Sequence, residues 1–181
     1  MRILGIDPGS NVTGYGVIDR ASGQLVHVAH GTVRFPPRQP LALRLHHLWI
    51  ALSDVLEAHR PDVAVVEQVF VAASPRSALV LGQARGVALA ALGSAGLPVS
   101  EYSATAIKQT VTGGGRASKQ QVARMVCRTL ALERTPASDA ADALAAAIAH
   151  AHAGKLTLMG AGRRGSRRSL RDLAPRQGSA R

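Results

Sequence analysis

Residues 62–67 have the sequence D-V-A-V-V-E, and this stretch decides the fold class. Its four central residues are all apolar, so a strand formed by them would be buried on both faces, as strands in parallel sheets are. The neighbouring segments fit such a sheet. Leucines recur at steps of three and four between residues 41 and 56, which predicts an amphipathic helix ending near Pro61, and residues 77–95 form a second, almost wholly apolar helical segment.

The remaining segments extend this sheet in both directions. Three short apolar runs precede it, and their short connections predict an antiparallel meander. One further strand and three helices follow. The predicted strands are Arg2–Asp7, Thr13–Asp19, Gln24–Val33 and Pro98–Tyr102, and the predicted helices are 104–112, 119–132 and 138 to about 153. This order indicates an α/β domain with a mixed five-stranded sheet flanked by helices.

Charge is distributed unevenly over the 181 residues. The chain carries 22 Lys and Arg against 11 Asp and Glu, a net charge of +11, and only three of the basic residues are lysines. We divide the chain into a folded domain, residues 1–157, and a basic tail, residues 158–181. We expect the tail to be disordered because Gly, Arg and Ser dominate its sequence. An arginine-rich excess favours a polyanionic partner, nucleic acid first. Composition bias and solubility are the alternative explanation.

Other features bear on the compartment. No stretch approaches the roughly 18 uncharged apolar residues that a membrane span needs, and the N-terminus enters a strand at once instead of a secretory leader. The single cysteine, Cys127, excludes an internal disulfide and a cysteine-rich zinc site. We therefore expect a cytoplasmic protein without membrane contact.

Four carboxylates lie in or beside apolar segments: Asp7, Glu67, Asp139 and Asp142. Taken singly, each has an ordinary structural explanation as a turn former, a strand end or a first-turn helix acid. Together they point to a site. If the strands that end at Asp7 and Glu67 are parallel neighbours, these two side chains meet at one sheet edge. Asp139 and Asp142 are three residues apart and share one face of the last helix.

A cluster of four acids repels itself unless cations lie within it. Hard oxygen ligands in a partly open site suit Mg²⁺, and Mn²⁺ as a substitute. Two such ions roughly 3.5–4 Å apart are a common device for phosphodiester cleavage. The sequence therefore predicts a site with two metal ions held by the four acids.

Four stretches occur in order along the chain that together resemble the RuvC Holliday-junction resolvases. The stretches are G-I-D-P-G-S-N-V-T-G-Y-G-V-I (5–18), V-V-E-Q-V-F (65–70), L-G-Q-A-R-G (81–86) and D-A-A-D-A-L-A (139–145). The resemblance covers about residues 1–153 and includes the lysine-bearing stretches I-K-Q-T-V-T-G and S-K-Q-Q-V. The basic tail lies outside it.

The resemblance implies a ribonuclease-H-like fold, a homodimer, and magnesium-dependent nicking of two opposed strands of a four-way DNA junction in recombination and repair. It identifies the four acids as the catalytic, metal-binding residues. It also implies cooperation with the RuvA and RuvB branch-migration proteins.

Further residues are candidates for holding DNA. The family pattern places a base-stacking aromatic at Phe70, for which packing against its own domain is the alternative. Lys108 and Lys119 would contact the scissile phosphate, although both could be ordinary solvated helix lysines. Arg76, Arg85 and Arg116 are additional phosphate candidates, and a role in the dimer is the alternative for Arg85.

Two other classes of protein share some of these features. The D-x-G-S element after the first strand resembles the phosphate loop of actin-like ATPases, but this chain is too short for their two subdomains. A junction-binding protein without activity is the other class, and the intact set of acids argues against it.

Overall fold

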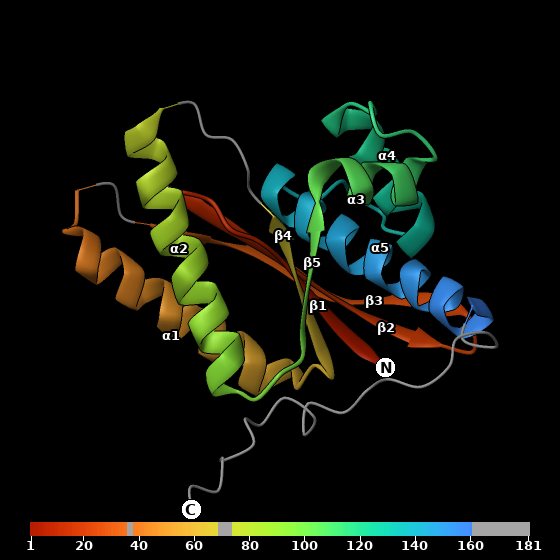
Figure 1. The fold of residues 1–181 in the computed structure, drawn as a ribbon, viewed down its shortest axis with the longest axis horizontal. Coiled ribbons are helices and arrows are strands. Elements are labelled where there is room, and N and C mark those ends of the chain that lie inside the picture. Colours follow the sequence, from red (N-terminus) through yellow and green to blue (C-terminus); the bar gives the residue numbers. More distant parts are fainter. Residues whose placement is uncertain (36–37, 69–73, 161–181) are drawn as a thin grey trace, which may run out of the picture.

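We describe the fold from a computed structural model, which covers residues 1–35, 38–68 and 74–160, the last seven by their backbone only. A single five-stranded sheet lies at its centre, with the strand order β3-β2-β1-β4-β5 (Figure 1). The strands are β1 (Arg2–Asp7), β2 (Val12–Ala21), β3 (Gln24–Arg34), β4 (Val63–Gln68) and β5 (Val99–Ser103). The predicted mixed sheet of five strands is thus confirmed.

The pairing of the strands changes from antiparallel to parallel at β1. β1, β2 and β3 form an antiparallel meander, whereas β4 runs parallel to β1 and β5 runs parallel to β4. Ser22 and Gly23 connect β2 to β3 with φ angles of 49° and 84°. Two successive positive φ values are typical of the tight hairpin turns that match the twist of the strands.

Five helices complete the described fold: α1 (Leu41–His59), α2 (Pro75–Ser94), α3 (Ala104–Thr112), α4 (Lys119–Leu130) and α5 (Ser138–Gly160). Serines begin three of them, because the side chains of Ser74, Ser103 and Ser118 accept a hydrogen bond from a backbone N–H of the first turn. Several ends differ from the prediction, most of them by one or two residues. α4 stops at Leu130 because Ala131 is left-handed, with φ 51°, and α5 extends beyond Ala153.

The helices cover the two faces of the sheet separately. α1 and α2 lie on one face, where Leu4, Ile6 and Val17 of the strands pack with Leu48 and Leu52 of α1 (Figure 1). α5 lies on the opposite face with α3 and α4 outside it. This division follows from the alternation of side chains along each strand, which sends Ile3 and Leu4 into different cores.

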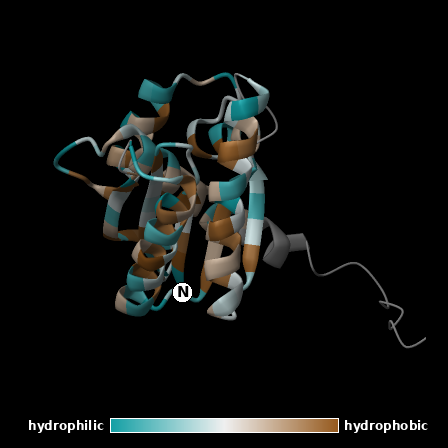
Figure 2. Ribbon diagram, turned by 90° about the vertical axis from the view of Figure 1, so that its left-hand side faces the viewer, coloured by the Kyte–Doolittle hydropathy of each residue, from teal (hydrophilic) through white to brown (hydrophobic). Residues whose placement is uncertain are grey.

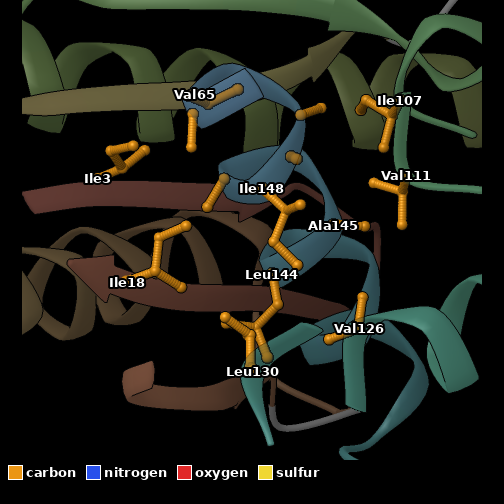
Figure 3. Packing of buried hydrophobic residues seen from close by; sticks show 14 of the residues in the cluster. Ile3, Ile18, Val65, Ile107, Val111, Val126, Leu130, Leu144, Ala145 and Ile148 are labelled. Atoms are coloured by element: carbon orange, nitrogen blue, oxygen red, sulfur yellow. The ribbon is translucent and has the colours of Figure 1, made fainter. Parts of the chain in front are cut away.

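α5 is the central element of its layer. Leu144 and Ile148 lie between the strand residues and those of α3 and α4 (Figure 3). Seven consecutive residues, 143–149, are buried, which is possible because the helix has neighbours on nearly every side. The packing of α5 against the strands therefore fixes the position of its first turn relative to the sheet.

α2 is more exposed than its composition suggests. Among the described helices, it alone has the length and the apolar composition of a membrane-spanning helix. Only 22% of its apolar stretch is buried in the structure. Figure 2 looks from the side of α1 and α2 and shows hydrophobic and hydrophilic residues interleaved along them. Arg85 of α2 forms an ion pair with Glu101 of β5 at 2.7 Å, and Ala84 and Ala88 pack in the core. These contacts make α2 an integral helix of the domain.

Candidate active site

Asp7 and Glu67 lie next to each other at one edge of the sheet, as predicted. Ile6 of β1 is paired with Val66 of the parallel strand β4, so the next residue of each strand lies at the same level. Ile6 and Val66 are buried under α1 and α2. Because side chains alternate along a strand, Asp7 and Glu67 point to the other face, which α5 covers.

Glycines in the strands bring α5 onto this face. A Cβ atom added to Gly5 of β1 would overlap the backbone carbonyl of Ala143, and one added to Gly14 of β2 would overlap the carbonyl of Asp139. The helix backbone therefore lies directly against the strand backbones, which a larger side chain would prevent. This close approach places the beginning of α5, with Asp139 in its first turn and Asp142 in the next, beside Asp7.

A small cavity joins these elements. It has a volume of about 130 Å³ and is lined by Asp7 and Glu67 from the strands, Asp142 from α5, Lys108 from α3 and Lys119 from α4. The Nζ atom of Lys119 donates a hydrogen bond to Oδ2 of Asp142 at 2.9 Å. Charged side chains from five different elements, far apart in the sequence, thus meet in one place.

The electrostatics of the cavity are dominated by burial and by like charges. Burial, and then the charges of Glu67 and Asp142, raise the pKa of Asp7 to about 8, with a smaller contribution from Asp139. Burial and Asp142 also raise the pKa of Glu67, against the opposing effect of both lysines. The hydrogen bond to Asp142 raises the pKa of Lys119 and keeps it charged. A group of carboxylates that the two lysines compensate only in part is therefore the main feature of the site.

The donor set fits hard divalent cations such as Mg²⁺ and Mn²⁺, because it consists of carboxylate oxygens in a partly buried, self-repelling group. In the arrangement seen here, no three Asp, Glu, His or Cys side chains of the described residues are close enough to ligate one ion together. Lys119 instead supplies the positive charge beside Asp142. Cations would neutralise the remaining charge of Asp7 and Glu67.

The chain matches proteins of a known family. The family model of "Crossover junction endodeoxyribonuclease RuvC" matches residues 3–150. The chain belongs to the RuvC family. A RuvC from Alkalilimnicola ehrlichii is 57% identical over 151 residues, which cover 83% of this chain and 91% of that protein.

Solved RuvC structures have the same fold. Thermus thermophilus RuvC matches with a TM-score of 0.77 at 33% identity, covering 86% of this chain and 96% of that one. The same protein in complex with a Holliday junction substrate matches with a TM-score of 0.81 at 34% identity and the same coverage. The predicted resemblance to RuvC and the predicted ribonuclease-H-like fold are confirmed.

The four predicted acids of this RuvC chain do not contribute equally to the cavity. Asp7, Glu67 and Asp142 line it, whereas Asp139 does not. Asp139 lies about one turn before Asp142 on α5 and acts on Asp7 and Lys119 through its charge. The catalytic and metal-binding roles of all four remain predictions.

The predicted DNA contacts are more scattered than the acids. Lys108 and Lys119 line the cavity. Arg76 is exposed at the beginning of α2, and Arg116 is exposed in the connection between α3 and α4, where it lines a different cleft. Phe70 lies outside the described residues.

Sequence reasoning missed the residues that seat α5. Gly14 and Gly16 are two positions apart in β2, so both face α5, and Gly5 does so from β1. Glycine at alternate positions of a strand can indicate the close approach of another backbone, and the T-G-Y-G stretch of this RuvC sequence contained that signal. The Arg85–Glu101 ion pair was also unforeseen, and Gln68 extends it by donating to Glu101 at 3.4 Å.

Proposed function

We propose that this chain is a structure-selective DNA endonuclease that resolves Holliday junctions by paired, symmetric nicks. The observation that carries the proposal is the meeting of Asp7, Glu67 and Asp142 with two lysines in one cavity at the sheet edge. Membership of the RuvC family supports the substrate, because a family structure contains a Holliday junction. Recombination and DNA repair are the processes that produce such junctions.

Asp7, Glu67, Asp139 and Asp142 would hold two Mg²⁺ ions, for which Mn²⁺ can substitute. When bound, such ions lower the pKa of an attacking water and stabilise the charge on the departing oxygen. Asp7 is central to the group because both Glu67 and Asp142 act on it electrostatically. Its carboxyl must lose its proton before it can ligate a cation.

The lysines would neutralise the phosphate that is cut. Lys119 has a raised pKa and is therefore charged at neutral pH. Its side chain is 69% exposed, so its ammonium group can reach a phosphate while it remains close to Asp142. Lys108 enters the same cavity from α3 and would contact the DNA from the other side.

Other residues would position the junction. Phe70, in the connection that follows β4, would stack on bases near the cut, and Arg76 would contact phosphates at the start of α2. Arg116 would bind a phosphate farther from the cut. These contacts read the shape of the DNA more than its sequence.

A homodimer would address the two opposed strands of a junction, because two-fold symmetry of the protein matches two-fold symmetry of the substrate. The outer surface of α2 supports an intermolecular contact: Leu79 is 68% exposed there, beside the small residues Gly82 and Gly86. RuvA and RuvB would deliver the junction by branch migration. All of these events would take place in the cytoplasm.

One gel experiment tests the proposed function. Labelled four-way junction and linear duplex DNA are incubated with the protein in magnesium and, separately, in chelator. We expect symmetric nicks in the junction alone, with magnesium alone, and none from Asp7→Asn. Asp54→Asn, which changes an exposed acid on α1, is the control and should cut normally. Equal cutting of linear duplex, or full activity of Asp7→Asn, would contradict the proposal.

A further inference from the structure

A second, larger cleft lies beside α4. Its volume is about 530 Å³, and its lining includes Arg116 and Ala117 from the loop before α4 and Arg124, Met125 and Arg128 from the helix. The active-site cavity is lined by Lys119 and Val122 of the same helix. Because α4 has 3.6 residues per turn, Arg124 and Arg128 project from a different side of it than Lys119 and Val122. α4 therefore separates the two sites.

The cleft is strongly basic. Arg116, Arg124 and Arg128 are all exposed, and within the described residues none of them forms an ion pair. The chain has no acid between Glu101 and Glu133, a segment that contains five basic residues. Arg124 makes only a local hydrogen bond among the described residues, from its Nε to the backbone oxygen of Gln120 at 3.4 Å. The three planar donor groups thus remain available to an anion.

The arrangement of these arginines is unfavourable without a ligand. Arg124 and Arg128 are four residues apart on one helix face, where like charges destabilise a helix by a few tenths of a kcal/mol. Arg128 is in the last turn, where the helix dipole offsets part of this effect. No such compensation applies to Arg124, in the middle of the helix. An anionic ligand would relieve the repulsion at both.

We propose that this arginine cleft binds the sugar–phosphate backbone of the DNA arm that adjoins the cut. Arginine suits this ligand because its guanidinium group donates two parallel hydrogen bonds to a phosphate. Ala117 and Met125 add apolar surface that can contact deoxyribose. The inference rests on the proposed function, since it assigns a second contact region to the same substrate.

The distance to the active site fits one continuous DNA strand. Arg116 lines the cleft and Lys119 lines the active site, three residues apart. Three residues span at most about 10–11 Å. One strand of a duplex advances about 3.4 Å per nucleotide along the axis. Arg116 would therefore contact a phosphate within about three nucleotides of the cut.

Salt-dependent binding tests this assignment. Arg124→Ala and Arg128→Ala are compared with the wild type on a fluorescent four-way junction, in chelator so that no cleavage occurs. Each variant should bind about tenfold more weakly at low salt, and the slope of log K against log salt should flatten by about 0.9 for each phosphate that the variant no longer binds. Arg60→Ala is the matched control, because Arg60 is exposed at the end of α1, before the N-terminal end of β4, and lines neither cavity; it should leave both quantities unchanged.

Two further measurements keep the result unambiguous. Arg124→Lys retains the charge and should restore most of the slope but not all of the affinity, even if the alanine variants fold poorly. Ethylation of phosphates within about three nucleotides of the cut should weaken binding of the wild type and not of the variants.

Slopes and affinities equal to those of Arg60→Ala would overturn the assignment while leaving the proposed nuclease intact. Weakened DNA binding by the arginine variants, together with a wild type that nicks no junction, would overturn the nuclease and retain the cleft.

Discussion

Replacing Asp7 by Asn should stabilise the cation-free protein at neutral pH. Burial and the charges of Glu67 and Asp142 raise the pKa of Asp7 from 3.8 to about 8, so its carboxyl is mostly protonated in the folded state at pH 7. In the unfolded chain the same group ionises at its ordinary pKa. Asn has the shape of the protonated carboxyl and does not titrate. Folding of the variant therefore requires no uptake of a proton at position 7.

The sign follows from proton binding. Between about pH 4 and pH 8 the folded protein holds a proton at Asp7 that the unfolded chain has released. Stability falls as pH rises wherever the folded state binds more protons, so this contribution is fully present below about pH 4 and lost toward pH 8. Each pH unit in this window lowers the free energy of unfolding of the wild type by at most about 1.4 kcal/mol. The loss at pH 7 is therefore at most about 4 kcal/mol. Relaxation of the neighbouring charges reduces this, and we expect about 1–3 kcal/mol.

Urea unfolding in chelator at about pH 5 and pH 7.5 measures the effect. The difference in unfolding free energy between Asp7→Asn and the wild type should be positive and grow with pH, whereas Asp54→Asn should show no such growth. Saturating magnesium should reverse the order, because the wild type binds cations that the variant cannot hold. A wild type more stable than Asp7→Asn in chelator, by the same amount at both pH values, would refute the electrostatic reasoning.

Three other predictions concern the elements around the cavity. Gly5→Ala should destabilise the fold by about 1–3 kcal/mol in urea unfolding because its methyl group meets the backbone of α5, whereas Gly82→Ala, with open space around it, should not destabilise it. Lys119→Gln should slow junction nicking on the order of 100-fold in single-turnover assays, with near-normal unfolding; an unchanged rate would make Lys119 a surface residue. Deleting residues 161–181 should flatten the salt dependence of non-specific DNA binding and leave the nicking rate unaltered.

Most of the fold could be predicted from local patterns. The consecutive apolar residues of β4 and the spacing of leucines in α1 depend only on which surface each element buries. The ends were less predictable. α4 stops where Ala131 adopts a left-handed conformation that glycine usually marks, so the sequence contained no stop signal there.

The parts of the site that follow from strand topology and helical spacing could be predicted from the sequence. The parallel pairing of β1 and β4 brings Asp7 and Glu67 together, and helical spacing brings Asp142 near them. The ion pair between Lys119 and Asp142 was not predictable, because it depends on the packing of α4 against α5 through Val122 and Val126. The same limit applies to Asp139, whose exclusion from the cavity is set by the rotation of α5.

The close approach of α5 to the strands explains both the chemistry and the instability of the site. Glycine at position 14 allows the helix backbone to touch the sheet, and this contact brings Asp142 within reach of Asp7. The same contact excludes water from Asp7 and places it among like charges, which raises its pKa. The attraction of a cation that replaces the proton would offset both the repulsion and the cost of desolvation. Separating α5 from the sheet would therefore stabilise Asp7 in its ionised form and weaken cation binding at the same time.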